Sequence, residues 1–209
     1  MAQDEAALSD AFYRDLAFGT GGLRGVIGAG TNRMNVYTVA KASQGLANYV
    51  VRRFSPEARR IAVSYDSRIK SDLFARVAAG VFAASGISVF IYPQLMPTPC
   101  LSYAVRALGC AAGVMVTASH NPAKYNGYKV YGSDGCQITT EAADEALREI
   151  EQLDIFADVK QADFDACLAD GSIQWIPNST YDNFTRAVRG QSVLTADDPI
   201  DRDVSIVYT

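Results

Sequence analysis

The 209-residue chain contains a single histidine, His120, and its four cysteines include no Cys-x-x-Cys pair. A structural zinc site needs four closely spaced Cys or His ligands, so we do not expect one here. The cysteines also lack the spacing of a disulfide framework and are scattered at Cys100, Cys110, Cys136 and Cys167. Scattered cysteines of this kind are typical of a reducing compartment, which predicts a cytoplasmic location.

Long apolar runs and an excess of positive charge are missing too. Residues 1–15 are acidic and no run could span a bilayer, so we expect neither a signal peptide nor a membrane segment in this chain. The 19 Lys and Arg and the 23 Asp and Glu give a net charge of −4, which argues against nucleic acid or an anionic membrane as a partner. With 49% hydrophobic and 20% charged residues, the composition is that of a globular domain. A small anionic substrate is still compatible with the weak net negative charge, because Arg and Lys side chains can cluster locally.

The first two thirds of the chain alternate amphipathic helices with short β-rich runs. Helices are expected at 5–16, 35–54, 71–85 and 98–107, and strands at 60–65, 87–92 and 111–116. Asn35 and Ser71 are expected to cap two of these helices, and Gly86 to end one. This alternation predicts an α/β domain with a largely parallel sheet.

The pattern changes after residue 116. Residues 128–131 and 136–138, joined by the Gly-Ser-Asp-Gly turn at 132–135, are typical of a hairpin. Thr140 is expected to cap an acidic helix that runs to about residue 153, and 155–195 are expected to be mixed helix and loop. Residues 204–208 are typical of a new strand, so a domain boundary is expected near 190–203.

The most informative segment is Thr117–Pro122 (T-A-S-H-N-P), directly after the buried strand 111–116. In open α/β sheets, ligands gather beyond the carboxyl ends of the strands. Pro122 biases the residue before it away from helix, so Ser119 should lie in a sharp, exposed loop. Asn126-Gly127 is interpreted as a further turn, and Lys129 should return on the next strand.

Two chemistries could use such a serine. Acyl transfer with His120 as base is disfavoured, because adjacent residues in an extended loop usually point apart and no G-x-S-x-G elbow is present. Phosphoryl transfer would place a phosphate on Ser119, and the phosphate would need nearby cations such as Lys129, Arg24 or a divalent metal. The segment taken alone is also compatible with a plain polar loop.

The glycine-rich stretch 18–33 fits neither familiar phosphate-loop pattern. Arg33 stands where a dinucleotide fingerprint needs its third glycine, and no Gly-Lys-Ser/Thr follows Gly30. The stretch is therefore interpreted as a loop of close backbone approach whose arginine, Arg24, suits an anionic ligand. The alternative is that Arg24 pairs with a local carboxylate.

Taken together, these segments resemble the α-D-phosphohexomutase family, which includes phosphoglucomutases and phosphomannomutases. The resemblance covers roughly residues 12–140 and implies a three-layer α/β/α domain with a mixed, mostly parallel sheet. The motifs occur in order along the chain: Phe18–Gly25 (F-G-T-G-G-L-R-G), Gly30–Asn35 (G-T-N-R-M-N), Tyr65–Arg68 (Y-D-S-R), Pro97–Pro99 (P-T-P), Thr117–Pro122 and Tyr125–Gly135 (Y-N-G-Y-K-V-Y-G-S-D-G).

The resemblance implies catalytic roles for four residues. Ser119 matches the family's phosphoserine, whose phosphate helps coordinate Mg²⁺, so Ser119 is also a metal ligand by implication. Arg24 matches an arginine near the reaction centre, Lys129 a residue for proton transfer or phosphate contact, and His120 an acid/base helper. Asp66-Ser67-Arg68 matches a family motif that we interpret as structural rather than catalytic.

The implied reaction interconverts hexose 1-phosphate and hexose 6-phosphate through a bisphosphate intermediate, with glucose 1,6-bisphosphate as intermediate or activator. The resemblance favours glucose, and mannose or pentose phosphates are the alternatives. The family's metal, sugar and phosphate loops lie in further domains that we do not find here. We therefore expect residues 1–195 to form the first domain and 196–209 to be a linker and the first strand of a second, in a chain trimmed at both ends and inactive alone.

Two other classes of function are disfavoured by these residues. One is a non-catalytic sugar-phosphate-binding module, which would tend to lose Ser119, Lys129 and Arg24. The other, a serine hydrolase, would need a second histidine, since His120 is the only one and lies next to the serine.

Overall fold

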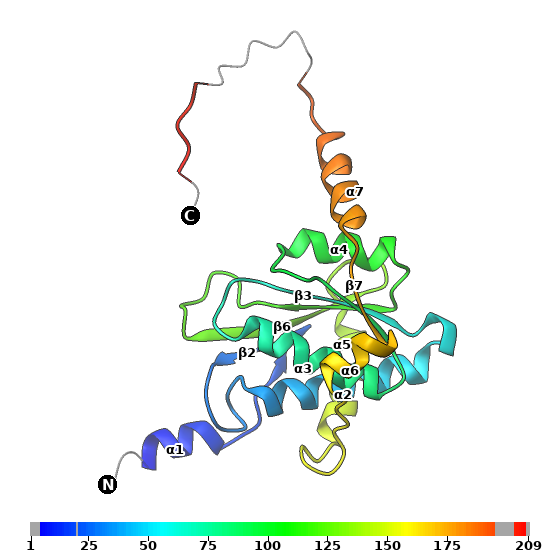
Figure 1. Cartoon of the computed structure of the whole chain (residues 1–209). Coiled ribbons are helices and arrows are strands. Elements are labelled where there is room, and N and C mark those ends of the chain that lie inside the picture. Colours follow the sequence, from blue (N-terminus) through cyan, green and yellow to red (C-terminus); the bar gives the residue numbers. More distant parts are fainter. Residues whose placement is uncertain (1–4, 20, 195–202, 208–209) are drawn as a thin grey trace.

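The computed structural model describes residues 5–19, 21–194 and 203–207, and their strands form one mixed sheet. The strand order is β1-β2-β6-β5-β3-β4-β7 (Figure 1). Strands β5, β3, β4 and β7 pair in parallel, whereas β1, β2 and β6 join the other side antiparallel. The bounds are Phe18–Gly19 (β1), Gly22–Val26 (β2), Arg60–Tyr65 (β3), Ser88–Ile91 (β4), Ala112–Val116 (β5), Tyr125–Gly132 (β6) and Ile173–Trp175 (β7).

Helices cover both faces of this sheet, as Figure 1 shows. One face carries α2, α3, α5 and α6, and the other carries α4 and α7. The predicted three-layer α/β/α fold, with parallel strands in the core of a mixed sheet, is thereby confirmed. The bounds are Glu5–Phe12 (α1), Val36–Arg53 (α2), Ser71–Ala84 (α3), Thr98–Ala107 (α4), Thr140–Glu151 (α5), Phe164–Asp170 (α6) and Asn178–Arg189 (α7), with a short 3₁₀ turn at Pro56–Ala58.

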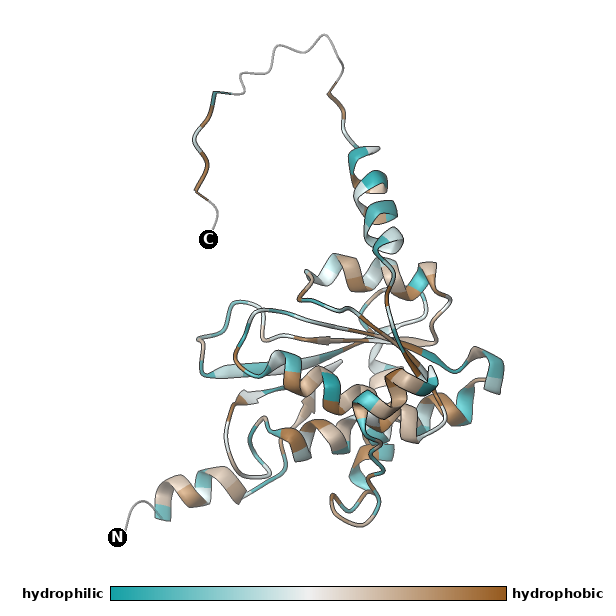
Figure 2. Ribbon diagram, viewed as in Figure 1, coloured by the Kyte–Doolittle hydropathy of each residue, from teal (hydrophilic) through white to brown (hydrophobic). Residues whose placement is uncertain are grey.

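The core is divided by the sheet into two apolar layers. The larger lies against α2, α3 and α5 and includes Leu46, Phe74 and Phe82, and the smaller lies beneath α4 and includes Leu101 and Met115. In Figure 2 the hydrophobic colours follow the strands and the inner faces of these helices. Each fully buried side chain of this size stabilises the fold by about 1.5–3 kcal/mol.

Asn35 is the N-cap of α2, as predicted. Its side-chain oxygen accepts hydrogen bonds from the backbone N–H groups of Tyr37 and Thr38, and the Thr38 hydroxyl accepts one from the backbone N–H of Asn35. The Asn35 Nδ2 also donates to the carbonyls of Gly28 and Gly30, at 2.9 Å each. The cap therefore fixes both the start of α2 and the glycine-rich loop before it.

Several predicted helix ends were wrong. Helix α1 ends at Phe12 rather than near residue 16, because the Leu16 N–H bonds to the carbonyl of Thr31 instead of continuing a helix. Ser71 does not cap α3: Lys70 holds the cap position, and the Ser71 hydroxyl donates to Asp66. The cap of α5 is Thr139 and not Thr140.

The segment after β5 also differs from its prediction. Asn126-Gly127 is not a turn but part of β6, and the expected hairpin is reduced to a single bridge between Tyr131 and Gln137. Residues 203–207 form no strand with the described part of the chain. Residues 195–202 and 208–209 lie outside the described residues, so the domain boundary near 190–203 stays a prediction.

Candidate active site

Ser119 lies in the connection between β5 and β6, beyond the carboxyl end of a fully buried strand. It is exposed, as the sequence predicted, and its backbone is left-handed, with φ of 56°. Within the described residues, only Lys70 is another non-glycine residue with positive φ. A left-handed conformation costs a non-glycine residue about 1–2 kcal/mol, so the surrounding contacts must hold Ser119 in place.

Lys129 lies on β6 and faces the serine directly. Its Nζ donates a hydrogen bond of 2.7 Å to the Oγ of Ser119. Partial burial lowers the pKa of Lys129 from its ordinary value, and the positive charge of Arg24 lowers it further. The predicted return of Lys129 on the next strand is confirmed, and its ammonium can exchange a proton with the serine oxygen.

Arg24 lies on β2, where it pairs in register with Gly127 of β6. Because Gly22 pairs with Lys129 two positions along, Arg24 and Lys129 share one face of the sheet. Arg24 is exposed, and it forms no ion pair within the described residues. The alternative that it pairs with a local carboxylate therefore finds no support among the ion pairs of the described residues.

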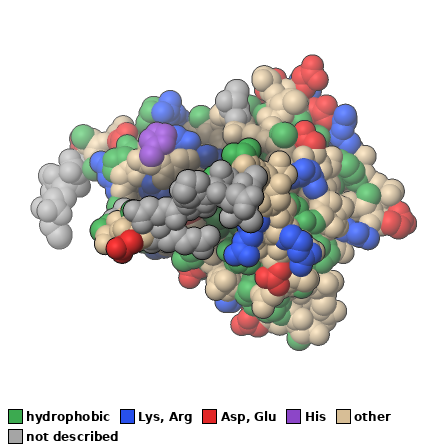
Figure 3. All heavy atoms as spheres, turned by 90° about the horizontal axis from the view of Figure 1, so that it is seen from above, with side chains coloured by type: hydrophobic (Ala, Val, Ile, Leu, Met, Phe, Trp, Pro, Cys, Tyr) green, Lys and Arg blue, Asp and Glu red, His purple; other side chains and the backbone are tan. Residues whose placement is uncertain are grey.

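His120 is exposed beside Ser119, and no hydrogen bond to its side chain is found in the described part of the chain. In Figure 3, which shows the molecule from above, the histidine in purple lies at the surface near Lys and Arg side chains in blue. The structure thus brings Ser119, Lys129 and Arg24 together. His120 lies next to the serine in the chain, and none of the described residues holds its side chain by a hydrogen bond.

The loop that carries Ser119 is anchored by side chains from the β3–α3 connection. The Ser119 N–H donates to the Oγ1 of Thr117 at 2.9 Å, and this hydroxyl donates to Asp66 at 2.6 Å. Arg68 lies next to the same carboxylate and donates to the carbonyl of Ser119 at 2.6 Å. The structural interpretation of Asp66-Ser67-Arg68 stays a prediction, but these contacts tie the motif to the serine loop.

Two residues of this support, Thr117 and Asn126, were not among the site residues predicted from the sequence. The Asn126 side chain is buried and donates to the carbonyl of Ile69 and to the hydroxyl of Ser71. Its neighbour Gly127 lies so close to the carbonyl of Thr117 that a Cβ would stand 2.5 Å from that oxygen. The Asn-Gly pair was a real signal, but it marks close packing within a strand and not a turn.

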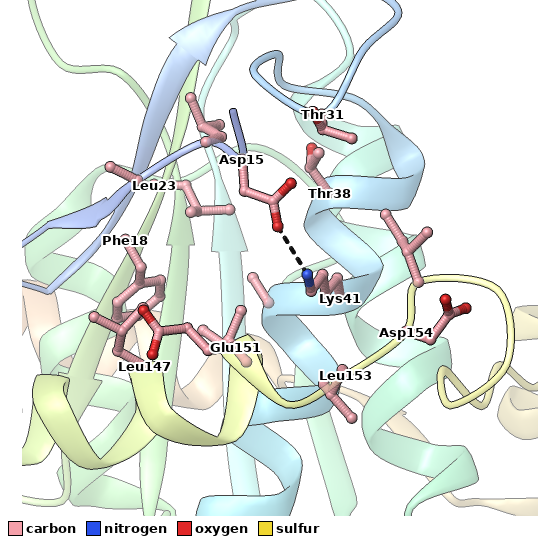
Figure 4. A pocket seen from close by; sticks show the side chains of 15 residues that line it. Asp15, Phe18, Leu23, Thr31, Thr38, Lys41, Leu147, Glu151, Leu153 and Asp154 are labelled. Carbon is pink, nitrogen blue, oxygen red and sulfur yellow. Dashed lines mark hydrogen bonds and ion pairs between the residues drawn. The ribbon is translucent and has the colours of Figure 1, made fainter. Parts of the chain in front are cut away.

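Of the hollows on the described surface, one lies at the serine loop and another lies beside α2 and α5. One, of about 400 Å³, opens beside Ser119 and is lined by Asp66–Ile69, Asn121 and Ala123. Figure 4 shows the other, of about 330 Å³, between residues 15–18, α2 and α5, where Lys41 and Asp15 form an ion pair of 2.9 Å. Leu23 lines this second hollow, and side chains alternate along β2, so it lies on the face opposite Arg24.

The part of the chain that the structure describes offers few ligands for a metal. It contains no group of three or more His, Cys, Asp or Glu side chains that could hold a metal ion. Both carboxylate oxygens of Asp66 already accept hydrogen bonds, from the hydroxyls of Ser71 and Thr117. None of the described helices is both long and apolar enough to cross a membrane.

Fold and site together define a three-layer α/β domain that presents an exposed serine and a lysine at the carboxyl edge of its sheet. The family model for phosphoglucomutase/phosphomannomutase, alpha/beta/alpha domain I, matches residues 15–155. The chain therefore belongs to the phosphoglucomutase/phosphomannomutase family.

Individual relatives agree with this assignment. The chain is 48% identical over 138 residues to the "Probable phosphoribomutase" of Schizosaccharomyces pombe, covering 66% of this chain and 24% of that protein. It is 41% identical over 181 residues to a phosphoglucomutase of Staphylococcus aureus (strain bovine RF122 / ET3-1), covering 86% and 32%. The crystal structure of a "putative phosphomannomutase" from Thermus thermophilus matches with a TM-score of 0.63 and 31% identity, covering 72% and 32%. The chain thus spans about a quarter to a third of the length of these relatives.

Proposed function

We propose that this chain is the phosphoserine-bearing domain of a phosphohexomutase, which interconverts hexose 1-phosphate and hexose 6-phosphate through a bisphosphate. The observation that carries the proposal is the 2.7 Å hydrogen bond from Lys129 Nζ to the exposed Oγ of Ser119, within a domain of this family. Phosphoryl transfer depends mostly on positioning and charge neutralisation, which a fixed serine beside two cations can supply.

The transfer can be written with Ser119 and Lys129 alone. The bond between phosphorus and Oγ of phosphoserine breaks while phosphorus bonds to the free sugar hydroxyl. Oγ takes a proton from the Lys129 ammonium, and the proton lost by the sugar hydroxyl restores that ammonium. In the return step, Oγ attacks the other phosphate of the bisphosphate, here glucose 1,6-bisphosphate, while the bond between that phosphorus and its sugar oxygen breaks. The departing sugar oxygen takes a proton from the Lys129 ammonium, and the proton lost by Oγ restores that ammonium.

Arg24 and His120 have supporting roles in this proposal. Arg24 shares the sheet face of Lys129 and has no ion pair within the described residues, so its charge is available to the transferring phosphoryl group. His120 is exposed next to Ser119, where its imidazole can exchange a proton with a sugar hydroxyl.

Among the described residues, Ser119 is the one through whose phosphate this chain would contribute to a magnesium site. The described residues hold no cluster of three metal-ligating side chains, so the chain would contribute phosphate oxygens and further domains the remaining ligands. When bound, Mg²⁺ would neutralise charge on the phosphoryl oxygens. This chain alone should therefore bind Mg²⁺ weakly and should not isomerise sugar phosphates, so its partners are the sugar phosphate and the remaining domains of its protein.

Glucose phosphate is the proposed substrate, with pentose phosphate as the second candidate. A relative named phosphoglucomutase is 41% identical over 181 residues, and one named "Probable phosphoribomutase" is 48% identical over 138. Mannose phosphate is a third candidate, and a cytoplasmic location remains part of the proposal. A non-catalytic sugar-phosphate-binding module is the competing class.

The test uses the complete protein that contains this chain, with Mg²⁺, a trace of glucose 1,6-bisphosphate, and glucose, mannose or ribose 1-phosphate. We expect turnover and a phosphate on Ser119 by mass spectrometry, both lost in Ser119→Ala. Ser133→Ala, an exposed serine in the turn after β6, is the matched control and should keep full turnover. A wild-type protein that is inactive on all three sugars and unphosphorylated would leave the binding module as the better conclusion.

A further inference from the structure

We propose that Arg68 is the positioning residue of this site and that its guanidinium clamps the loop 119–125 so that Ser119 faces Lys129. This inference rests on the proposed function for its effect on turnover. The clamp itself is a property of the loop, and it can be measured without any reaction.

The guanidinium of Arg68 binds four backbone carbonyls of one loop. Nη2 donates to the carbonyls of Ser119 and Asn121, at 2.6 Å each. Nη1 donates to the carbonyls of Pro122 and Tyr125, at 3.2 and 3.1 Å. All four acceptors are more than fifty residues away in the chain, so Arg68 closes the loop from outside.

The remaining N–H of the guanidinium faces a carboxylate. Arg68 Nε lies 3.5 Å from Asp66 Oδ2, which also accepts the hydroxyl of Thr117 at 2.6 Å. An arginine has five N–H donors in a rigid fork, and here Nη1 and Nη2 make four hydrogen bonds to carbonyls while Nε faces the Asp66 carboxylate as an ion pair. Because both Nη atoms are committed to the loop carbonyls and Nε faces Asp66, Arg68 acts through the loop and not on a phosphate on Ser119.

The clamp fixes the peptide groups on both sides of Ser119. The Ser119 N–H is held by Thr117, which is itself bound to Asp66, and the Ser119 carbonyl is held by Arg68. With both ends held, the left-handed backbone of Ser119 at φ of 56° is kept, and its Oγ stays 2.7 Å from Lys129. Loss of the clamp should let Ser119 relax to an ordinary backbone conformation and turn its Oγ away.

A lysine cannot replace this clamp, because its ammonium has three donors at one point and no planar fork. Arg68→Lys is therefore the test variant. Arg59 offers a matched control, because it also binds two backbone carbonyls, those of Phe54 and Val51, but lies outside the serine loop. Arg59→Lys should cost stability without affecting the loop 119–125.

The experiment compares the complete wild-type protein with its Arg68→Lys and Arg59→Lys variants. We expect amide hydrogen exchange in residues 117–126 to become about tenfold faster in Arg68→Lys, with α2 unchanged. With glucose 1-phosphate, kcat should fall about 100-fold while KM stays within about threefold, since the loss is one of alignment. Arg59→Lys should change neither loop exchange nor kcat.

Unchanged loop exchange in a folded Arg68→Lys protein overturns the clamp, whatever the activity shows. Faster exchange with an unchanged kcat overturns the positioning role, provided that the wild type turns over. A wild type without turnover defeats the proposed function instead, and the exchange result then still decides whether the clamp exists. If the melting temperature of Arg68→Lys is lower than that of Arg59→Lys, Arg68→Gln replaces Arg68→Lys in the same comparison. Its amide keeps two N–H donors.

Discussion

The Nζ of Lys129 lies 2.7 Å from the Oγ of Ser119, although ten residues separate them in the chain. The antiparallel pairing of β5 and β6 produces this approach, because it places Lys129 opposite Met115, near the point where the chain leaves β5 for the serine loop. The distance is therefore set by the register of two strands and not by the loop alone.

Replacing Lys129 by Met should lower turnover of the complete protein about 10²- to 10⁴-fold, because the serine oxygen loses its proton partner. The thioether side chain keeps the length of lysine, so packing on β6 should change little. Lys160→Met, at an exposed position, is the control and should retain wild-type turnover. The proton-transfer role is wrong if both variants turn over equally fast at every pH.

Replacing Arg24 by Gln should raise the pKa of Lys129. Burial is the main cause of the lowered pKa of Lys129, and the positive charge of Arg24 is the second, because it disfavours a second cation on the same sheet face. Removing Arg24 deletes only the second cause, so the pKa should move part of the way back toward its ordinary value. NMR titration of the Lys129 Nζ in the phosphate-free chain measures this directly, and an unchanged or lower pKa contradicts it.

Replacing Asn35 by Ala should destabilise the chain by about 1–2 kcal/mol, because α2 loses its N-cap. Asn35→Asp is the matched variant: it keeps an oxygen for the backbone N–H groups of Tyr37 and Thr38 but loses the donor to Gly28 and Gly30. We expect the Asp variant to recover part of the loss in urea denaturation. Equal stabilities of the Ala and Asp variants would show that the Nδ2 contacts carry the whole effect.

The features that the sequence predicted well are local in the chain. The alternating helices and strands follow from hydrophobic periodicity over short windows, and Asn35 has the side chain that a helix start requires. The exposure of Ser119 follows from a turn that stands directly after a buried strand. Even the meeting of Ser119 with Lys129 could be predicted, because it needs only that the next strand return beside the first.

The features that escaped prediction depend on contacts between distant segments. Arg68 binds carbonyls 51 to 57 residues further along the chain, and a backbone carbonyl has no signature in the sequence. Ser71 has the composition of a cap, but its hydroxyl is used by Asp66, so the tertiary contact overrides the local preference. The Asn126 side chain likewise donates hydrogen bonds to Ile69 and Ser71 from within a strand, whereas the local preference of an Asn-Gly pair favours a turn.

Gly127 should tolerate no side chain, because a Cβ there would stand 2.5 Å from the carbonyl oxygen of Thr117 and 3.0 Å from that of Leu23. Both neighbours are backbone atoms in paired strands, so neither can move without disturbing the sheet. Gly127→Ala should therefore lower the free energy of unfolding by about 1–3 kcal/mol, as overpacking usually does. Gly28→Ala is the control, since its Cβ would meet only the flexible Arg33 side chain at 3.8 Å.

The two glycine variants also separate stability from the site. Because Thr117 holds the N–H of Ser119, a shift of its carbonyl in Gly127→Ala should loosen the serine loop as well as the sheet. We expect amide hydrogen exchange in residues 117–126 to be faster in Gly127→Ala and unchanged in Gly28→Ala. Urea denaturation is measured on the same samples. A Gly127→Ala chain as stable as Gly28→Ala would mean that β6 does not approach Thr117 this closely, and that the register placing Lys129 beside Ser119 is different.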